Sequence, residues 1–83
     1  MEQFSLKEYL NNPNRKIITR DGRKVRILCT DRISEHFPVE DQGMYPIIAL
    51  VDGERREDIM SYTENGLLLY DSEEKEDLFF DSK

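Results

Sequence analysis

Three pairs of an Asp or Asn followed by glycine constrain the fold of this 83-residue chain most strongly: Asp21-Gly22, Asp52-Gly53 and Asn65-Gly66. Such pairs tolerate the positive φ angles that tight hairpin turns require. Each pair lies beside a short run rich in Ile, Val, Leu, Thr and Tyr, and such runs favour strands. The sequence therefore predicts a small antiparallel sheet whose strands follow one another through hairpins.

A short helix is predicted near the N-terminus. Ser5 and Glu8 have the spacing of a capping box, and Phe4 and Tyr9 have that of a hydrophobic staple. Asn12 precedes a proline, which disfavours the helical conformation, so the helix should end at about residue 11. A helix of two turns is not stable alone, and its apolar face is therefore expected to dock on the sheet.

The predicted fold class is α+β: a short N-terminal helix packed on a twisted antiparallel β-meander of about five strands, which can curl into a small open barrel. Residues 1–83 form a single small domain. Residues 47–51 are apolar without alternation, which predicts a central strand covered on both faces. Strands are expected near residues 16–20, 24–30, 46–51, 58–63 and 67–70, with 78–80 as a sixth strand at an edge, and residues 30–45 as a long loop.

The first hairpin also predicts a register. With Asp21-Gly22 as a two-residue loop, Arg20 faces Arg23 and Ile18 faces Val25. The predicted core comprises Leu6, Tyr9, Leu10, Ile18, Val25, Ile27, Cys29, Ile48, Leu50, Met60, Tyr62, Leu69 and Phe79.

Charge is distributed unevenly along the chain, whose net charge is −6. Residues 1–32 carry eight basic and four acidic side chains, and residues 33–83 carry four basic and fourteen acidic ones, so the two parts have net charges of +4 and −10. This polarity predicts either a surface with two charged faces or attraction between the two halves of one domain.

The length and composition of the chain constrain the size of any cavity and the cellular compartment of the protein. A chain of this length buries roughly 60–65% of its unfolded surface, so it has little room for a deep cavity. Its single cysteine, Cys29, excludes an internal disulfide and suits the reducing cytoplasm. The sequence contains neither a signal peptide nor an apolar run long enough to span a membrane, so a cytoplasmic location is predicted.

No pattern in the sequence indicates catalysis or a cofactor. His36 and Cys29 are too few ligands for a metal site of nitrogen and sulfur donors. The acidic run 71–77 lacks the glycine and the bidentate glutamate of a calcium-binding EF-hand loop, which predicts a solvated connection. Phosphate-binding, dinucleotide-binding and nucleophile-elbow motifs are absent from the sequence. We therefore expect a protein that is not an enzyme, with no metal or cofactor.

The basic hairpin at residues 15–26 is the one distinctive patch, with Arg20, Arg23, Lys24 and Arg26 as candidate contacts. Phosphates or an acidic protein surface are the partners that such a cationic ribbon fits, and Phe37 or Tyr45 would be placed to stack on bases. Pairing with the acidic half is the structural alternative, and the acidic composition of the whole chain disfavours nucleic acid.

One peptide motif at the C-terminal end has a second interpretation. Asp77-Leu78-Phe79 is similar to the end of the motif by which bacterial replication proteins dock on the sliding clamp, although the upstream glutamine is absent. A short strand that packs on the core is the alternative.

The combined pattern resembles a group of short uncharacterised proteins of Bacteroides-type gut bacteria, often prophage- or mobile-element-associated. The resemblance is carried by Phe4–Leu10, Thr19–Arg23, Val25–Asp31, Tyr45–Val51, Tyr62–Gly66 and Asp77–Phe79, and it spans nearly the whole chain. It implies a bacterial or phage cytoplasmic protein and supplies no functional residues.

Two functions are therefore expected from the sequence. The first is a non-catalytic protein-interaction module with an unknown protein partner, and imitation of nucleic acid by the acidic half would be one form of it. The alternative is nucleic-acid binding through the basic hairpin.

Overall fold

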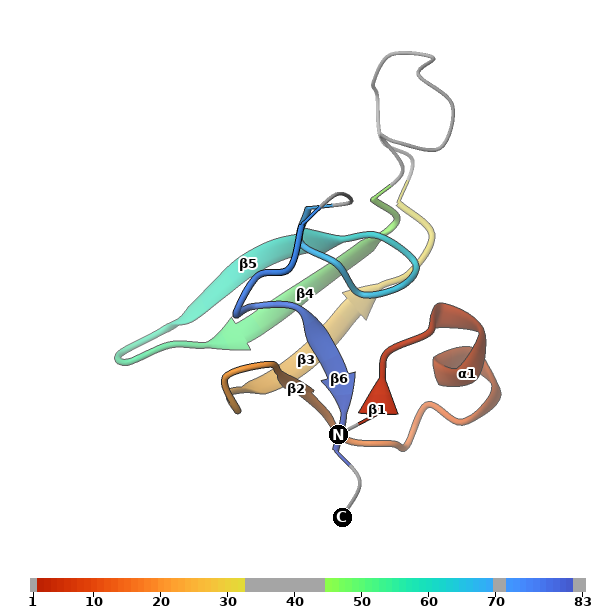
Figure 1. Ribbon diagram of the computed structural model, residues 1–83, viewed down its shortest axis with the longest axis horizontal. Coiled ribbons are helices and arrows are strands. Elements are labelled where there is room, and N and C mark those ends of the chain that lie inside the picture. The colour runs from red at the N-terminus through yellow and green to blue at the C-terminus, as the bar shows by residue number, and fades with distance from the viewer. Residues whose placement is uncertain (1, 33–44, 70–71, 82–83) are drawn as a thin grey trace.

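Six strands form one open antiparallel sheet with a short helix beside it in the computed structural model (Figure 1). Residues 2–32, 45–69 and 72–81 are described. The order of strands in the sheet is β1-β6-β2-β3-β4-β5. The elements are β1 (Glu2–Gln3), α1 (Leu6–Asn11), β2 (Ile17–Thr19), β3 (Lys24–Cys29), β4 (Ile47–Asp52), β5 (Glu57–Tyr62) and β6 (Leu78–Phe80).

The predicted meander is confirmed for β2 to β5, which are neighbours in chain order. The sixth strand predicted at residues 78–80 is confirmed, but its predicted position at an edge is wrong, because β6 lies between β1 and β2. The strand predicted at 67–70 is also wrong for its described residues, 67–69. The amide of Leu68 donates to the Asp77 carboxylate and Gly66 accepts from Leu78, so this stretch bonds to the C-terminal part of the chain and does not pair with β5.

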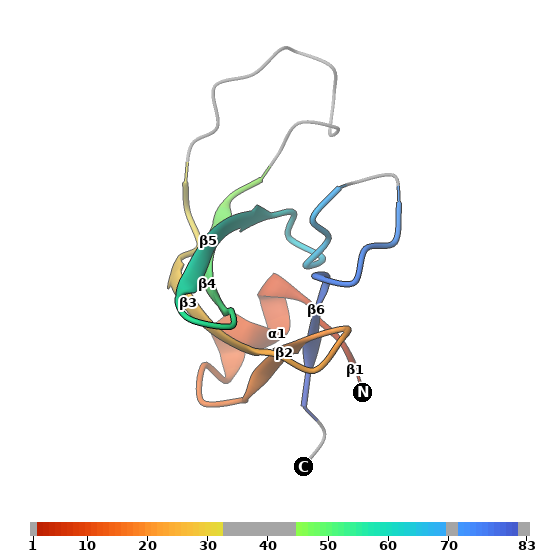
Figure 2. The same ribbon diagram turned by 90° about the vertical axis from the view of Figure 1, so that its left-hand side faces the viewer.

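The sheet curls without closing, so the small barrel that the sequence allowed is not formed. Figure 2 shows β5 and β6 turned toward each other at the two sides of the curl, with the segment after β5 between them. We call residues 63–69 and 72–77 the closing segment. The helix α1 lies at the end of the sheet away from the β4–β5 turn (Figure 1).

The first hairpin turn has three loop residues instead of the predicted two. The amide of Gly22 donates to the carbonyl of Thr19, and the amide of Thr19 donates to the carbonyl of Arg23, both at 2.9 Å. Gly22 has a φ of +89°, as expected where a tight turn is followed by a left-handed residue. Ile17 therefore faces Val25, so the predicted pairs of Ile18 with Val25 and of Arg20 with Arg23 are wrong.

The same turn recurs at the start of the closing segment. There the amide of Gly66 donates to the carbonyl of Thr63, and the amide of Thr63 donates to the carbonyl of Leu67. In both turns the threonine hydroxyl also accepts from the amide four residues on. Gly53 differs, because its φ lies outside the left-handed region and its amide donates to the carbonyl of Arg56. Asp52-Gly53 is therefore not the hairpin turn that the sequence predicted.

The one-residue slip changes which side chains are buried. A shift of one residue exchanges the two faces of a strand. On β2, Ile17 and Thr19 are buried and Ile18 is half-buried. On β4, Ile48 and Leu50 are only half-buried, so the prediction that this strand is covered on both faces is wrong. The observed core comprises Phe4, Ile17, Ile47, Ala49, Val51, Tyr62, Leu78 and Phe80, with Leu6, Tyr9, Val25, Ile27, Met60 and Leu68 partly buried against it.

Other predicted core residues are also corrected. Leu10 is 59% exposed and Leu69 is 47% exposed. Phe79 is half-buried on the outer face of β6. A register shift between Ile27 and Cys29 places Cys29 opposite Ile48, where it is half-buried instead of buried.

The predicted helix is confirmed at residues 6–11. Ser5 caps it by accepting from the amide of Glu8, which is one half of the predicted capping box. The rings of Phe4 and Tyr9 lie 6.0 Å apart, as the staple requires, and Phe4 also packs on Phe80 at 5.1 Å. The staple therefore anchors the helix to the core.

Candidate functional site

Asp77 holds the closing segment to the first hairpin. Its carboxylate is 1% exposed and accepts from the amides of Leu68 and Glu74, both at 2.9 Å. The guanidinium of Arg20 lies 3.2 Å from the same carboxylate, and the Arg20 amide donates to the Asp77 carbonyl. This buried carboxylate joins three groups, one nearby in sequence and two more distant, and therefore has a structural role. The sequence-based prediction of a solvated connection is therefore wrong for Asp77.

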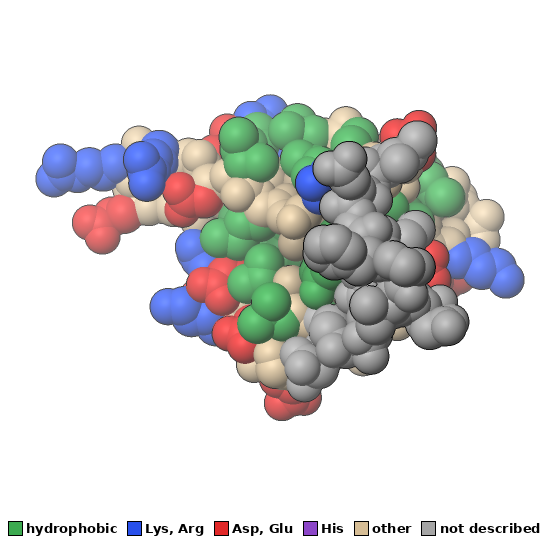
Figure 3. Space-filling model, turned by 90° about the horizontal axis from the view of Figure 1, so that it is seen from above, with side chains coloured by type: hydrophobic (Ala, Val, Ile, Leu, Met, Phe, Trp, Pro, Cys, Tyr) green, Lys and Arg blue, Asp and Glu red, His purple; other side chains and the backbone are tan. Residues whose placement is uncertain are grey.

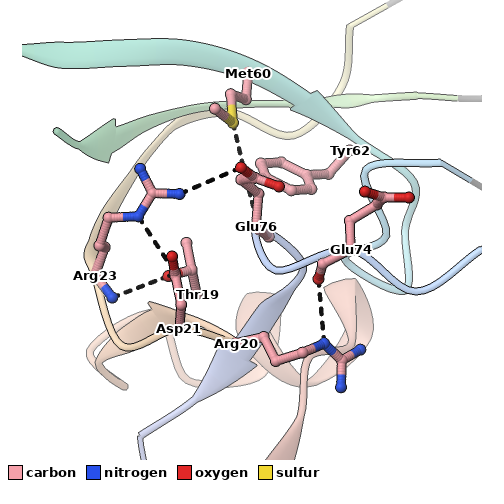
Figure 4. A network of polar contacts seen from close by, with 8 residues as sticks. All are labelled: Thr19, Arg20, Asp21, Arg23, Met60, Tyr62, Glu74 and Glu76. Atoms are coloured by element: carbon pink, nitrogen blue, oxygen red, sulfur yellow. Dashed lines mark hydrogen bonds and ion pairs between the residues drawn. The ribbon is translucent and has the colours of Figure 1, made fainter.

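The side chain of Arg20 binds groups of its own chain. Its Nε donates to the carbonyl of Glu74 at 3.1 Å (Figure 4), and its guanidinium lies 4.7 Å from the centre of the Phe79 ring. Together with the Asp77 contact, these interactions hold the guanidinium against the closing segment and β6.

Arg23 extends the same network toward the second half of the chain. It contacts Asp21 at 3.2 Å and Glu76 at 3.5 Å, and Thr19 donates to the Asp21 carboxylate (Figure 4). The hydroxyl of Thr19 and then the guanidinium of Arg23 lower the pKa of Asp21 below its usual value. The network thus favours the charged form of Asp21.

Tyr62 closes the network from the sheet side. Its hydroxyl donates to the carbonyl of Glu76 at 2.9 Å, and its ring is fully buried. Burial first, and then the negative charges of Glu76 and Asp77, raise the pKa of Tyr62. The phenol is therefore held in its neutral, donating form.

The other two candidate residues, Lys24 and Arg26, lie on the outer face of β3. Arg26 forms a two-bond ion pair with Glu57 of β5, at 2.6 and 2.8 Å, which lowers the pKa of Glu57. Lys24 has no ion pair among the described residues. The structure thus divides the predicted site in two, with Arg20 and Arg23 turned to the closing segment.

A basic groove lies beside Lys24 and Arg26. It has a volume of about 500 Å³, and Ile18 contributes to its lining. Arg15 binds Glu2 at 2.6 Å and lies over the ring of Phe80, so it too has partners within the chain. The charged side chains that line the groove are Arg15, Lys16, Lys24, Arg26 and Asp81.

An apolar patch covers the outer face of β3 to β5. Leu28 is 54% exposed and Ile59 is 72% exposed, and the half-buried Ile48 and Leu50 lie between them on β4. Leu50 pairs with Arg26 on one side and with Ile59 on the other. We call these four apolar residues the outer patch. Figure 3 shows one face of the molecule, where hydrophobic side chains gather between acidic and basic ones.

The described residues lack two features that often mark a reactive centre. They contain no group of three His, Cys, Asp or Glu residues that could hold a metal ion, and within them no buried side-chain nitrogen or oxygen lacks a hydrogen bond. No helix in the described part of the chain has the length and apolar character needed to cross a membrane. His36 and Phe37 lie outside the described residues.

The sliding-clamp interpretation of the C-terminal motif is contradicted. Asp77 and Leu78 are each 1% exposed, and Phe79 pairs with both β1 and β2. A docking peptide presents its side chains to a partner, whereas these residues build the core and the sheet.

The outer patch and Asp77 were not found by sequence reasoning. The run 47–51 gives no alternation from which to assign its faces, and the acidic run around Asp77 gives no sign that one carboxylate is buried. The sequence did contain a signal for the geometry of two turns, because the two Thr-Xaa-Asx-Gly segments, 19–22 and 63–66, share a pattern that indicates one turn type.

Comparisons of the chain with protein-family models, with curated proteins and with solved structures found no match. The resemblance to short proteins of Bacteroides-type bacteria therefore stays a prediction.

Proposed function

We propose that this chain is a non-catalytic protein-interaction module of a bacterial or mobile-element protein, working in the cytoplasm. The observation that carries the proposal is the outer patch. Leu28 and Ile59 are large apolar side chains that remain more than half exposed in a domain with little apolar surface to spare. Exposed apolar side chains that cluster, with charges around them, are typical of surfaces that bind other proteins.

The charged groups of the fold support the same proposal. Arg20, Arg23 and Arg26 each bind a carboxylate of their own chain, which supports a structural role for these arginines. The ion pair of Arg26 with Glu57 lies at the border of the outer patch. A polar border around an apolar centre is the usual arrangement of a protein interface.

Capture from a bacterial lysate tests this proposal, with the double variant Leu28→Ser, Ile59→Ser as the informative bait. Leu10→Ser is the matched control, because Leu10 is similarly exposed but lies on α1. We expect one protein to be retained by the wild type and by the control, and lost from the double variant. Retention of nothing above background at low salt, or equal retention by the double variant, would contradict the proposal.

Nucleic-acid binding is a second candidate, supported by the basic groove. Lys16 and Lys24 line it and form no ion pair with any residue that the structure describes, so they are free to contact phosphates. The double variant Lys16→Glu, Lys24→Glu should then abolish binding of single-stranded DNA or RNA, and binding by the wild type should weaken steeply with salt. Unchanged NMR shifts of residues 15–26 on addition of nucleic acid at low salt would reject this candidate.

A further inference from the structure

The outer edge of β5 carries few of the features that usually protect an edge strand, because its charged side chains are confined to its first two residues, Glu57 and Asp58. Natural edge strands are short, or contain proline, lysine or a bulge. At the other edge, β1 has two residues. By contrast, β5 has six residues without proline or lysine, and it pairs with β4 at six successive positions without a register shift. No described strand pairs with its outer side.

The hydrogen bonds of the β4–β5 hairpin show which backbone groups point outward. The amide of Gly53 donates to the carbonyl of Arg56, so these two residues form a hydrogen-bonded pair. In an antiparallel ladder such pairs alternate with non-bonded ones. The residues of β5 that bond to β4 are then Asp58, Met60 and Tyr62. The backbone groups of Glu57, Ile59 and Ser61 point away from the sheet.

The side chains beside this edge indicate the chemistry of an added strand. Ile59 is 72% exposed and adjoins Leu50 of the outer patch, so an apolar side chain opposite Ile59 would continue the apolar row. Glu57 and Asp58 stand at the start of the strand, where each pairs with an arginine of this chain, so the acidic excess that acts on a partner is that of the whole chain, whose net charge is −6. A basic segment would be attracted to this edge, and an acidic one repelled.

We propose that β5 binds an extended, basic and apolar segment of a partner protein as a seventh strand of the sheet. This inference rests on the proposed function and specifies the partner's binding element. The partner's backbone would bond to the amides and carbonyls of Glu57, Ile59 and Ser61, and its apolar side chain would cover Ile59. Strand addition of this kind takes affinity from the main chain and specificity from alternate side chains.

A displayed library of random short peptides provides the probe, followed by synthesis of the peptide that is enriched most. We expect enriched peptides to alternate apolar and polar positions, to contain Lys or Arg, and to lack proline at their centre. On binding, amide exchange of Ile59 and Ser61 should slow strongly, while that of Asp58 and Met60 should change little.

Ser61→Pro removes one outward amide without removing a bond to β4, and Ser61→Ala is the matched control that keeps this amide. Loss of one interfacial hydrogen bond should weaken peptide binding by about tenfold in Ser61→Pro, with Ser61→Ala close to wild type. Should Ser61→Pro fail to fold, N-methylation of alternate amides of the peptide makes the same test from the ligand side.

Several results would overturn the inference: no enriched peptide, equal affinity for Ser61→Pro, or a dimer of this chain that occupies the edge and dissociates in Ser61→Pro. A lysate partner that is lost from the Leu28→Ser, Ile59→Ser variant but retained by Ser61→Pro would overturn strand addition and leave the proposed function standing. Peptide binding at β5 without any protein captured from the lysate would leave strand addition standing and contradict the proposed function.

Discussion

Gly22 and Gly66 occupy the same position in two turns of the same geometry, with φ of +89° and +80°. Their surroundings differ. A Cβ at Gly22 would meet nothing within 4 Å, whereas a Cβ at Gly66 would lie 2.9 Å from the Cβ of Phe4 and 3.0 Å from that of Leu78. Gly66 therefore serves both as a left-handed residue and as the point where the closing segment crosses the core.

This pair separates backbone strain from packing. Gly22→Ala should cost about 1 kcal/mol of unfolding free energy, the cost of a left-handed alanine. Gly66→Ala should cost about 3 kcal/mol or more, because the methyl group also overpacks the core. Urea unfolding of both variants measures the difference. Equal losses would show that the closing segment does not lie against Phe4 and Leu78.

At the scale of the elements, the closing segment takes the place of a further strand. It covers the concave side between β5 and β6 without joining the sheet, and it is held by the Asp77 carboxylate and by the hydroxyl of Tyr62. Because these bonds come from single side chains, the segment should be sensitive to single substitutions.

Asp77→Ala should be the most damaging carboxylate substitution among the described ion pairs. It leaves the half-buried amides of Leu68 and Glu74 without an acceptor and Arg20 without its carboxylate partner, at a cost of about 3 kcal/mol. Asp58→Ala is the control, because the Asp58–Arg56 pair is solvent-exposed and should contribute less than about 1 kcal/mol. Similar midpoints in denaturant for the two variants would refute the role of Asp77.

The elements also show which parts of the fold the sequence predicts. The cap at Ser5 and the staple of Phe4 with Tyr9 depend on neighbours in sequence, and they were predicted correctly. The register of the first hairpin depends on whether its loop has two or three residues, and the Thr19 hydroxyl, which accepts from the Arg23 amide, helps to form the longer loop. The one additional loop residue exchanged the two faces of β2 relative to the predicted register.

The candidate site was predictable to a smaller degree. The basic residues of the first hairpin could be named, and attraction between the two halves of the chain could be stated as an alternative. The contacts of Arg20 with Asp77 and of Arg23 with Glu76 join residues 57 and 53 positions apart, and no local pattern specifies such distant pairs. The outer patch was missed for the same reason, because the faces of β4 are decided by the neighbouring strands.

At the scale of the whole molecule, the neutral phenol of Tyr62 links stability to alkaline pH. Its pKa is raised above the ordinary value of 10.0, so the folded state keeps a proton that the unfolded state loses. This contribution is fully present below pH 10 and is lost as the pH rises above it, by about 1.4 kcal/mol for each pH unit. Comparison of unfolding free energies for wild type and Tyr62→Phe between neutral and alkaline pH isolates it. Parallel curves for the two proteins would show that Tyr62 is not protected.

In the whole molecule, the closing segment covers one side of the curled sheet, and no described strand pairs with the outer side of β5, where we propose that a partner binds. Amide hydrogen exchange of the free protein, followed by NMR, tests this most directly. With an open β5 edge we expect slow exchange at Asp58, Met60 and Tyr62, and fast exchange at Ile59 and Ser61. Slow exchange at all five amides in the monomer would contradict it, because the edge would then already be covered.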